Sequence, residues 1–140
     1  MQDPFNLRRF VDAQNGVYAG VCAELRSGRK TGHWMWFIFP QIQGLGFSSM
    51  AQTFAISGLE EAAAYLNHTV LGPRLRECTG LVNRIEGRSI LQIFGTPDDM
   101  KFRSCMTLFA QAESGAQIFH DALEKYFAGA GDPLTIQRLR

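Results

Sequence analysis

One short segment of the chain combines the aromatic and polar side chains from which ligand pockets are built. Residues 33–39 read HWMWFIF, and a glutamine follows two positions later. A small-molecule pocket is mostly apolar, with a few polar groups that fix the orientation of the ligand. The imidazole, the two indole N–H groups and the glutamine amide are groups of this kind. The candidate binding residues in this segment are His33, Trp34, Trp36 and Gln41.

The same segment has a plainer interpretation as a piece of hydrophobic core. Large aromatic side chains bury much apolar area, and a buried indole needs only a partner for its N–H. Six consecutive apolar residues, 34–39, do not distinguish a buried strand from a buried helix. In a strand Trp34 and Trp36 would share a face, whereas in a helix they would lie about 200° apart. The sequence is therefore compatible with both interpretations of this segment, as hydrophobic core and as the wall of a pocket.

A second group of polar residues lies in the segment TPDDMKFRSCMTLF, residues 96–109. The pattern predicts a helix with Thr96 at the N-cap, Pro97 in the first turn and an aspartate three residues after the cap, as in a capping box. A helix N-terminus attracts anions, and basic side chains just after it can hold a phosphate or a carboxylate. The candidate residues in this half of the site are Asp99, Lys101, Arg103 and Ser104.

Helical periodicity also offers a structural explanation for this second segment. Phe102, Cys105, Met106 and Phe109 fall on one face of the predicted helix, which we expect to be buried. The opposite face is polar, and such a face is ordinarily only solvated. Acidic residues in the first turn complement the helix dipole without any ligand. The polar face consists of Arg103, Ser104, Thr107 and Gln111.

Apolar residues recur with helical spacing along most of the chain, so the elements that position these residues are predicted to be helices. We expect an all-α fold, a compact single-domain bundle of about five to seven helices over residues 1–140. Asp3 followed by Pro4 predicts an N-cap and the start of the first helix. Ser48 and Ser49 are possible caps for a helix near Met50. The stripes run through residues 4–14, 17–27, 59–66, 71–85, 97–112, 118–127 and 133–140.

Composition narrows the classes of partner. A net charge of +1 over 140 residues argues against nucleic-acid binding, which needs many basic groups on one face. No apolar run approaches the roughly 18 residues of a membrane span. The first residues lack the basic and apolar stretches of a signal peptide. Three cysteines far apart in the sequence, and no zinc-like spacing with the histidines, predict reduced thiols and no metal site. We expect a soluble cytoplasmic protein that binds neither nucleic acid nor membrane.

Catalytic motifs do not decide whether the protein is an enzyme. The sequence contains no GxSxG elbow, Walker loop or HExxH helix, and it implies no cofactor. Gly44-Leu45-Gly46 is too short for a dinucleotide fingerprint and favours a turn. Cys105 lies on the predicted buried face without a base. If there is chemistry, His33 or Asp99 would be the general acid or base.

Taken together, these blocks resemble a bacterial domain-of-unknown-function family whose members are sometimes labelled calpastatin. The specific blocks are HWMWFIFPQ and PDDMKFRSCMTLF, and the resemblance runs along essentially the whole chain. It implies an all-helical cytosolic domain without an established activity. Calpain inhibitors are flexible, weakly hydrophobic chains, so that label does not suit a sequence that is 46% hydrophobic. Cys105 departs from the small residue, such as serine, expected there. The matching positions are His33, Trp34, Trp36, Phe37, Pro40, Gln41, Asp99, Lys101, Arg103, Ser104 and Thr107.

Two functions from different classes follow from these residues. In the first, the aromatic segment and the start of the 96–109 helix meet around one pocket and bind a small anionic ligand such as a nucleotide or an ADP-ribose derivative, whose base stacks on tryptophan. In the second, the aromatic residues are core or an exposed patch, and the protein is a non-catalytic interaction module with a protein partner of unknown identity. The two differ on whether Trp34 and Trp36 border a hollow.

Overall fold

A computed structural model describes residues 2–112 and 117–140, and these residues form ten helices and no strand. The prediction of an all-α fold is confirmed. The expected five to seven helices correspond to the six that have seven or more residues, and four shorter ones raise the total. The bounds are α1 (Arg8–Gln14), α2 (Tyr18–Arg26), α3 (Met35–Ile38), α4 (Ser49–Thr53), α5 (Leu59–Asn67), α6 (Leu71–Asn83), α7 (Ile90–Phe94), α8 (Asp98–Ala112), α9 (Gln117–Phe127) and α10 (Pro133–Arg138).

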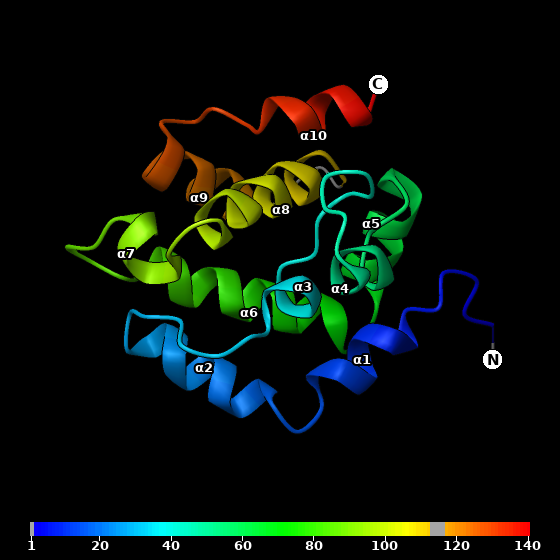
Figure 1. Ribbon diagram of the computed structural model, residues 1–140, viewed down its shortest axis with the longest axis horizontal. Coiled ribbons are helices and arrows are strands. Elements are labelled where there is room, and N and C mark those ends of the chain that lie inside the picture. The colour runs from blue at the N-terminus through cyan, green and yellow to red at the C-terminus, as the bar shows by residue number, and fades with distance from the viewer. Residues whose placement is uncertain (1, 113–116) are drawn as a thin grey trace.

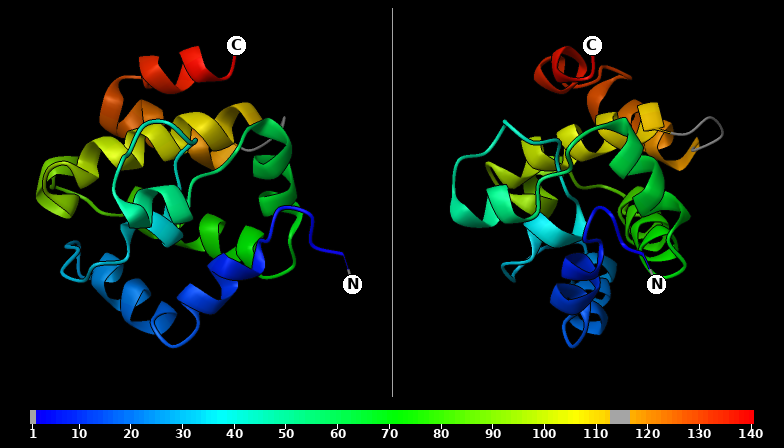
Figure 2. Two further views of the ribbon diagram at one scale, coloured as in Figure 1. Left: turned by 45° about the vertical axis from the view of Figure 1, so that its right-hand side comes forward. Right: turned by 90° about the vertical axis from the view of Figure 1, so that its right-hand side faces the viewer.

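The helices are stacked around α8. Figure 1 shows α10 along one edge, α8 and α9 beneath it, α6 across the middle and α1 and α2 along the opposite edge, and Figure 2 shows the same order from two other sides. Helix α8 packs against α5, α7, α9 and α10. Its predicted apolar face, Phe102, Cys105, Met106 and Phe109, is fully buried. The 3.6-residue period thus identified the centre of the core. No helix in residues 2–112 and 117–140 has the length and apolar character needed to cross a membrane.

The aromatic segment folds as the short helix α3, which separates its two tryptophans. Trp34 is only 4% exposed and its ring lies among those of Phe39 and Phe94, with centroid distances of 6.2 and 6.5 Å. Trp36 is partly exposed and packs on the edge of the core. The helical alternative is therefore the correct one, and the segment serves both as core and as surface.

Residues 41–57 form a loop that is closed at its base. Ile42 and Ile56 make an isolated parallel β-bridge, in which the Gln43 N–H donates to Ile56 and the Ile56 N–H donates to Gln41, each over 2.8 Å. Within the loop, the Ser48 hydroxyl accepts from the Ala51 N–H and caps α4, as predicted. The loop stands out from the helices on the left of the right-hand view in Figure 2.

One predicted helix start and one predicted capping box are wrong. The Asp3 carboxylate does accept hydrogen bonds from the N–H groups of Leu7 and Arg8, but α1 begins at Arg8 because Asn6 has a φ of 53°, outside the helical region. The capping box at Thr96 is also absent. The Asp99 N–H, which the Thr96 side chain would have capped, already donates to the Gly95 carbonyl over 2.9 Å.

Candidate functional site

Trp36 borders a cleft of about 280 Å³ between the 41–46 segment and the 51–55 segment. Three glutamines contribute polar groups to it, and Phe54 adds apolar surface. The side-chain amides of Gln41 and Gln43 make no hydrogen bond with any residue in the described part of the chain, so both remain available to a ligand. The lining residues are Trp36, Gln41, Ile42, Gln43, Gly44, Gly46, Ala51, Gln52, Phe54 and Ala55.

The glycines of this loop serve its close turns. Gly44 has a φ of 94°, and a Cβ there would lie 2.3 Å from the Arg138 guanidinium carbon, which packs against the loop from α10. A Cβ on Gly46 would lie 2.7 Å from the Cβ of Ala51. The positive φ of Gly44 supports the turn interpretation of Gly44-Leu45-Gly46. The absence of a side chain on Gly46 lets its backbone approach Ala51, which lines the cleft.

A small ion-pair cluster joins the aromatic segment to the start of α8. The Lys101 ammonium lies 5.5 Å from the centre of the Trp36 ring and 3.5 Å from Asp98. The other carboxylate oxygen of Asp98 is 2.8 Å from Lys30, whose ammonium is also 5.2 Å from the Trp34 ring. Two lysines therefore share one carboxylate. The two sequence segments meet here, at Lys101 and Trp36.

Trp34 does not line the cleft, and its polar group is used inside the fold. Its indole N–H donates to Glu24 over 3.1 Å, and the same carboxylate oxygen accepts from the N–H groups of Thr31 and Gly32 over 2.6 and 2.8 Å. Burial alone would raise the pKa of Glu24, but the hydrogen bonds from Gly32, Thr31 and Trp34 outweigh it and lower the pKa. Glu24 is thus a structural anchor for the chain that enters α3.

Glu24→Gln is expected to lower the free energy of unfolding by about 1–2 kcal/mol at pH 7, because charge-assisted hydrogen bonds are roughly twice as strong as neutral ones. The folded-state pKa is lowered, so the carboxylate stabilises the protein above its unfolded-state pKa and this contribution is lost as the pH falls through the folded-state pKa. Urea unfolding from pH 7 to pH 3 measures the difference, which should shrink toward pH 3. The control is Glu124→Gln, because the Glu124 side chain is exposed and makes no hydrogen bond with the described residues. An equal loss of stability in both variants would contradict the role of Glu24 as a structural anchor.

Arg103 and Ser104 bind the segment that leads into α10. The Arg103 guanidinium donates to the carbonyls of Ala130 and Gly131 over 3.0 and 3.1 Å. Ser104 donates to the buried carboxylate of Asp132 over 3.1 Å. The expectation that this face of α8 is solvated is also wrong for part of it, because Ser104 and Thr107 are buried. The cause is a segment 25 to 28 residues further along, which covers them.

The two candidate acid–base groups lie outside the cleft. His33 is exposed at the entrance to α3. Asp99 is partly buried, and one of its carboxylate oxygens has no hydrogen-bond partner within the described residues. Neither lines the cleft, whose described lining contains no carboxylate, imidazole or thiol. The cleft therefore has groups for binding and stacking rather than for proton transfer.

Comparisons with known proteins place this architecture in a family. A family model described as a protein of unknown function, DUF1810, matches residues 4–139. The chain belongs to the DUF1810 family. A crystal structure of the conserved hypothetical protein Rv1873 from Mycobacterium tuberculosis is similar, with 59% sequence identity, a TM-score of 0.97 and coverage of 98% of both chains. A search of curated proteins finds no match. The family resemblance inferred from the sequence blocks is confirmed.

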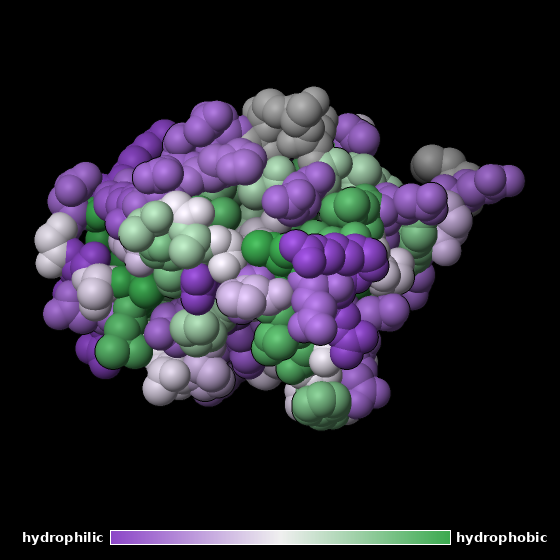
Figure 3. All heavy atoms as spheres, turned by 90° about the horizontal axis from the view of Figure 1, so that it is seen from above, coloured by the Kyte–Doolittle hydropathy of each residue, from purple (hydrophilic) through white to green (hydrophobic). Residues whose placement is uncertain are grey.

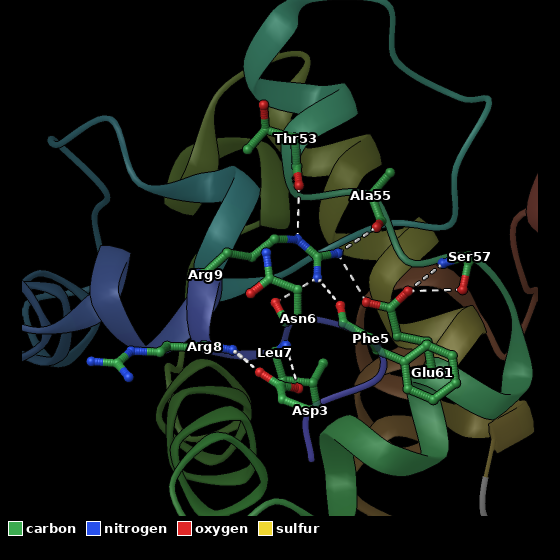
Figure 4. Close-up of polar contacts among 10 residues, drawn as sticks. All are labelled: Asp3, Phe5, Asn6, Leu7, Arg8, Arg9, Thr53, Ala55, Ser57 and Glu61. Atoms are coloured by element: carbon green, nitrogen blue, oxygen red, sulfur yellow. Dashed lines mark hydrogen bonds and ion pairs between the residues drawn. The ribbon is translucent and has the colours of Figure 1, made fainter. Parts of the chain in front are cut away.

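The cleft of this DUF1810 member depends on an arginine that the sequence did not single out. Figure 4 shows the Arg9 guanidinium, from α1, reaching the 53–57 segment that forms one wall of the cleft. It donates to the carbonyls of Thr53 and Ala55 over 2.8 and 2.9 Å and forms an ion pair with Glu61 at 2.9 Å. The other Glu61 oxygen accepts from the N–H and the hydroxyl of Ser57.

The remaining donors of Arg9 reach the carbonyls of Phe5 and Asn6, so the guanidinium is fully engaged. This pair is a structural clamp rather than a ligand site. Glu61 is almost fully buried, with a side chain 4% exposed. An Arg–Glu pair separated by 52 residues leaves no local pattern, which is why the sequence gives no signal for it.

Proposed function

We propose that this protein binds a small planar ligand with an anionic group, such as a nucleotide or an ADP-ribose derivative, at the Trp36 cleft. The observation that carries the proposal is the position of Trp36, which borders the cleft and lies 5.5 Å from Lys101. An aromatic ring offers a stacking surface to any nucleobase. The free amides of Gln41 and Gln43 supply donors and acceptors for its edge.

The size of the cleft favours one part of such a ligand. At about 280 Å³ it lies at the lower end of ordinary ligand pockets, which measure about 300–1,000 Å³. A base, with or without its ribose, suits that volume, and the phosphate would then lie outside, toward Lys101. Because Lys30 and Lys101 share Asp98, these three side chains keep one positive charge in excess for the phosphate.

Isothermal titration with AMP, ADP-ribose and adenosine tests the proposal. We expect saturable binding of AMP and ADP-ribose, at least a tenfold loss in Trp36→Ala and Gln41→Ala, and no change in Gln111→Ala, an exposed amide on α8. Lys101→Ala should bind AMP only as tightly as adenosine, because the contact with the phosphate is lost. Its affinity for adenosine should equal that of the unmodified protein. No saturable binding at millimolar ligand, or equal binding by Trp36→Ala, would overturn the proposal.

Exposed apolar residues beside the cleft support the second candidate, a protein-interaction module. Phe47 is 83% exposed and Leu134 60% exposed, and both line a hollow of about 450 Å³ between the loop and α10. Figure 3 looks onto the face that carries α10 and shows hydrophobic residues in separate groups between hydrophilic ones. A protein interface usually needs a larger continuous patch, so the first candidate is the stronger one. Under the second candidate, Phe47→Ser abolishes partner binding and Trp36→Ala does not.

A further inference from the structure

A further hollow, which shares no lining residue with the Trp36 cleft, collects three arginines. It measures about 500 Å³ and lies where α2 and α6 end, beside the 85–89 segment. Arg26 comes from the last turn of α2, Arg84 from the end of α6 and Arg88 from the connection to α7. Its apolar lining consists of the partly buried Ile85 and of Leu81, which is 9% exposed, above the fully buried Leu25.

None of these arginines forms an ion pair with an acid in the part of the chain that the structure describes. Glu86 also lines the hollow, but its side chain is 87% exposed and is paired with Lys125 at 3.4 Å. Because Lys125 balances the charge of Glu86, the three arginines leave three positive charges at this hollow, in a chain whose net charge is +1. Such an excess at one hollow attracts anions.

Helix capping, the ordinary role of basic residues at helix C-termini, does not account for Arg26 and Arg84. The Lys125 ammonium donates to the carbonyl of Asn83, the last residue of α6, and to that of Ile85 just beyond it, over 2.6 and 2.7 Å. Near the end of α2, the Glu24 carbonyl accepts from Ser27. Neither Arg26 nor Arg84 has a side-chain hydrogen bond or ion pair within residues 2–112 and 117–140.

The third arginine is held in place by the backbone. Its guanidinium donates to the Gln92 carbonyl over 3.3 Å. Its aliphatic part crosses the buried Gly28, where a Cβ would lie 3.1 Å from the Arg88 Cδ. Gly28 also has a φ of 82°, so glycine suits this position on both grounds. One fixed guanidinium and two free ones therefore surround an apolar floor.

We propose that this hollow is a binding site for a phosphate ester or diphosphate ester with an apolar body. Guanidinium groups pair with phosphate oxygens through two parallel hydrogen bonds, and Arg26 and Arg84 have all their donors available. The apolar part of the ligand would cover Ile85 and the exposed edge of Leu81. The site is separate from the Trp36 cleft, shares no lining residue with it and does not depend on the function proposed there.

Titration calorimetry at constant ionic strength with inorganic phosphate, pyrophosphate and phenyl phosphate tests this site. We expect pyrophosphate to bind more tightly than phosphate because of its greater charge, and phenyl phosphate to bind at least threefold more tightly than phosphate because its ring covers the apolar floor. Arg26→Ala/Arg84→Ala should lose at least tenfold in pyrophosphate affinity. Trp36→Ala should bind all three anions as the unmodified protein does.

The control is Arg140→Ala, which removes one exposed arginine elsewhere on the surface. A loss of affinity in this control equal to that in the double variant would mean nonspecific charge attraction and would overturn the proposal. So would unchanged binding in the double variant. Because Arg26 and Arg84 are exposed, the double variant should keep the unfolding midpoint of the unmodified protein, and circular dichroism checks this.

Discussion

Replacing Arg9 with methionine is expected to lower the free energy of unfolding by about 3–5 kcal/mol, the usual effect of removing one partner of a buried ion pair. Methionine keeps most of the aliphatic volume but none of the donors. It would leave the Glu61 carboxylate, 4% exposed, without its cation. The carbonyls of Thr53 and Ala55 would also lose their donors. The charge left behind dominates the loss, because an unpaired buried ion has no solvent to compensate it.

Urea unfolding measures this loss, and Arg8→Met is the matched control. Arg8 is the neighbouring arginine in α1 and pairs with Asp12, but the two side chains are 80% and 65% exposed, so its replacement should change stability by less than about 1 kcal/mol. The double variant Arg9→Met/Glu61→Leu should recover part of the loss, since it leaves no charge unpaired. A change below about 1 kcal/mol in Arg9→Met would show that the clamp does not hold the fold.

The same variant links stability to the candidate site. Arg9 holds the Ala55 carbonyl, and Ala55 lines the Trp36 cleft together with Phe54. Loosening the 53–57 segment would therefore disturb the wall of the cleft even in molecules that remain folded. In buffer without urea, at a temperature where both variants are folded, a ligand at Trp36 should bind Arg9→Met more weakly than Arg8→Met.

Sequence periodicity predicted the long helices because each buries one apolar stripe. The face of α8 with Phe102, Met106 and Phe109 follows the 3.6-residue period closely, and all three side chains are fully buried. Helices of four to six residues, such as α3 and α7, span too few turns for any period to appear. In α7 the local signal was the capping box of Ser89 and Gln92, which identifies the start of the helix more clearly than its apolar pattern.

The candidate site was predicted only in part, because local sequence patterns do not show which distant segments pack together. Composition identified Trp36, Gln41 and Lys101, which the fold brings to one region. A helical wheel assigns Arg103 and Ser104 to a polar face, but it cannot show which distant segment packs on that face. Their partners, Gly131 and Asp132, lie 28 residues away. The polar part of the second block therefore has a structural role in docking α10, which leaves fewer of its residues for a ligand.

Replacing Asp132 with alanine tests that role and is expected to lower the free energy of unfolding by about 3 kcal/mol. The Asp132 carboxylate is buried and accepts from the hydroxyls of Ser104 and Thr135 and from the Thr135 N–H, over 3.1, 2.6 and 3.0 Å. The two buried donors of Thr135 would be left without a partner, at about 1–3 kcal/mol each. The Ser104 hydroxyl can still donate to the Met100 carbonyl at 3.1 Å. The effect should be local as well as global, because Asp132 is the N-cap of α10.

Hydrogen exchange distinguishes this local effect from a general loss of stability. In Asp132→Ala the amides of α10 should exchange faster than those of α8 and α9 relative to the unmodified protein, since α10 loses its anchor while the apolar face of α8 stays buried. Asp12→Ala, at an exposed aspartate on α1, is the control and should change neither pattern. Uniform acceleration across all helices would contradict the docking role, because it would mean that Asp132 supports the whole core rather than the attachment of one helix.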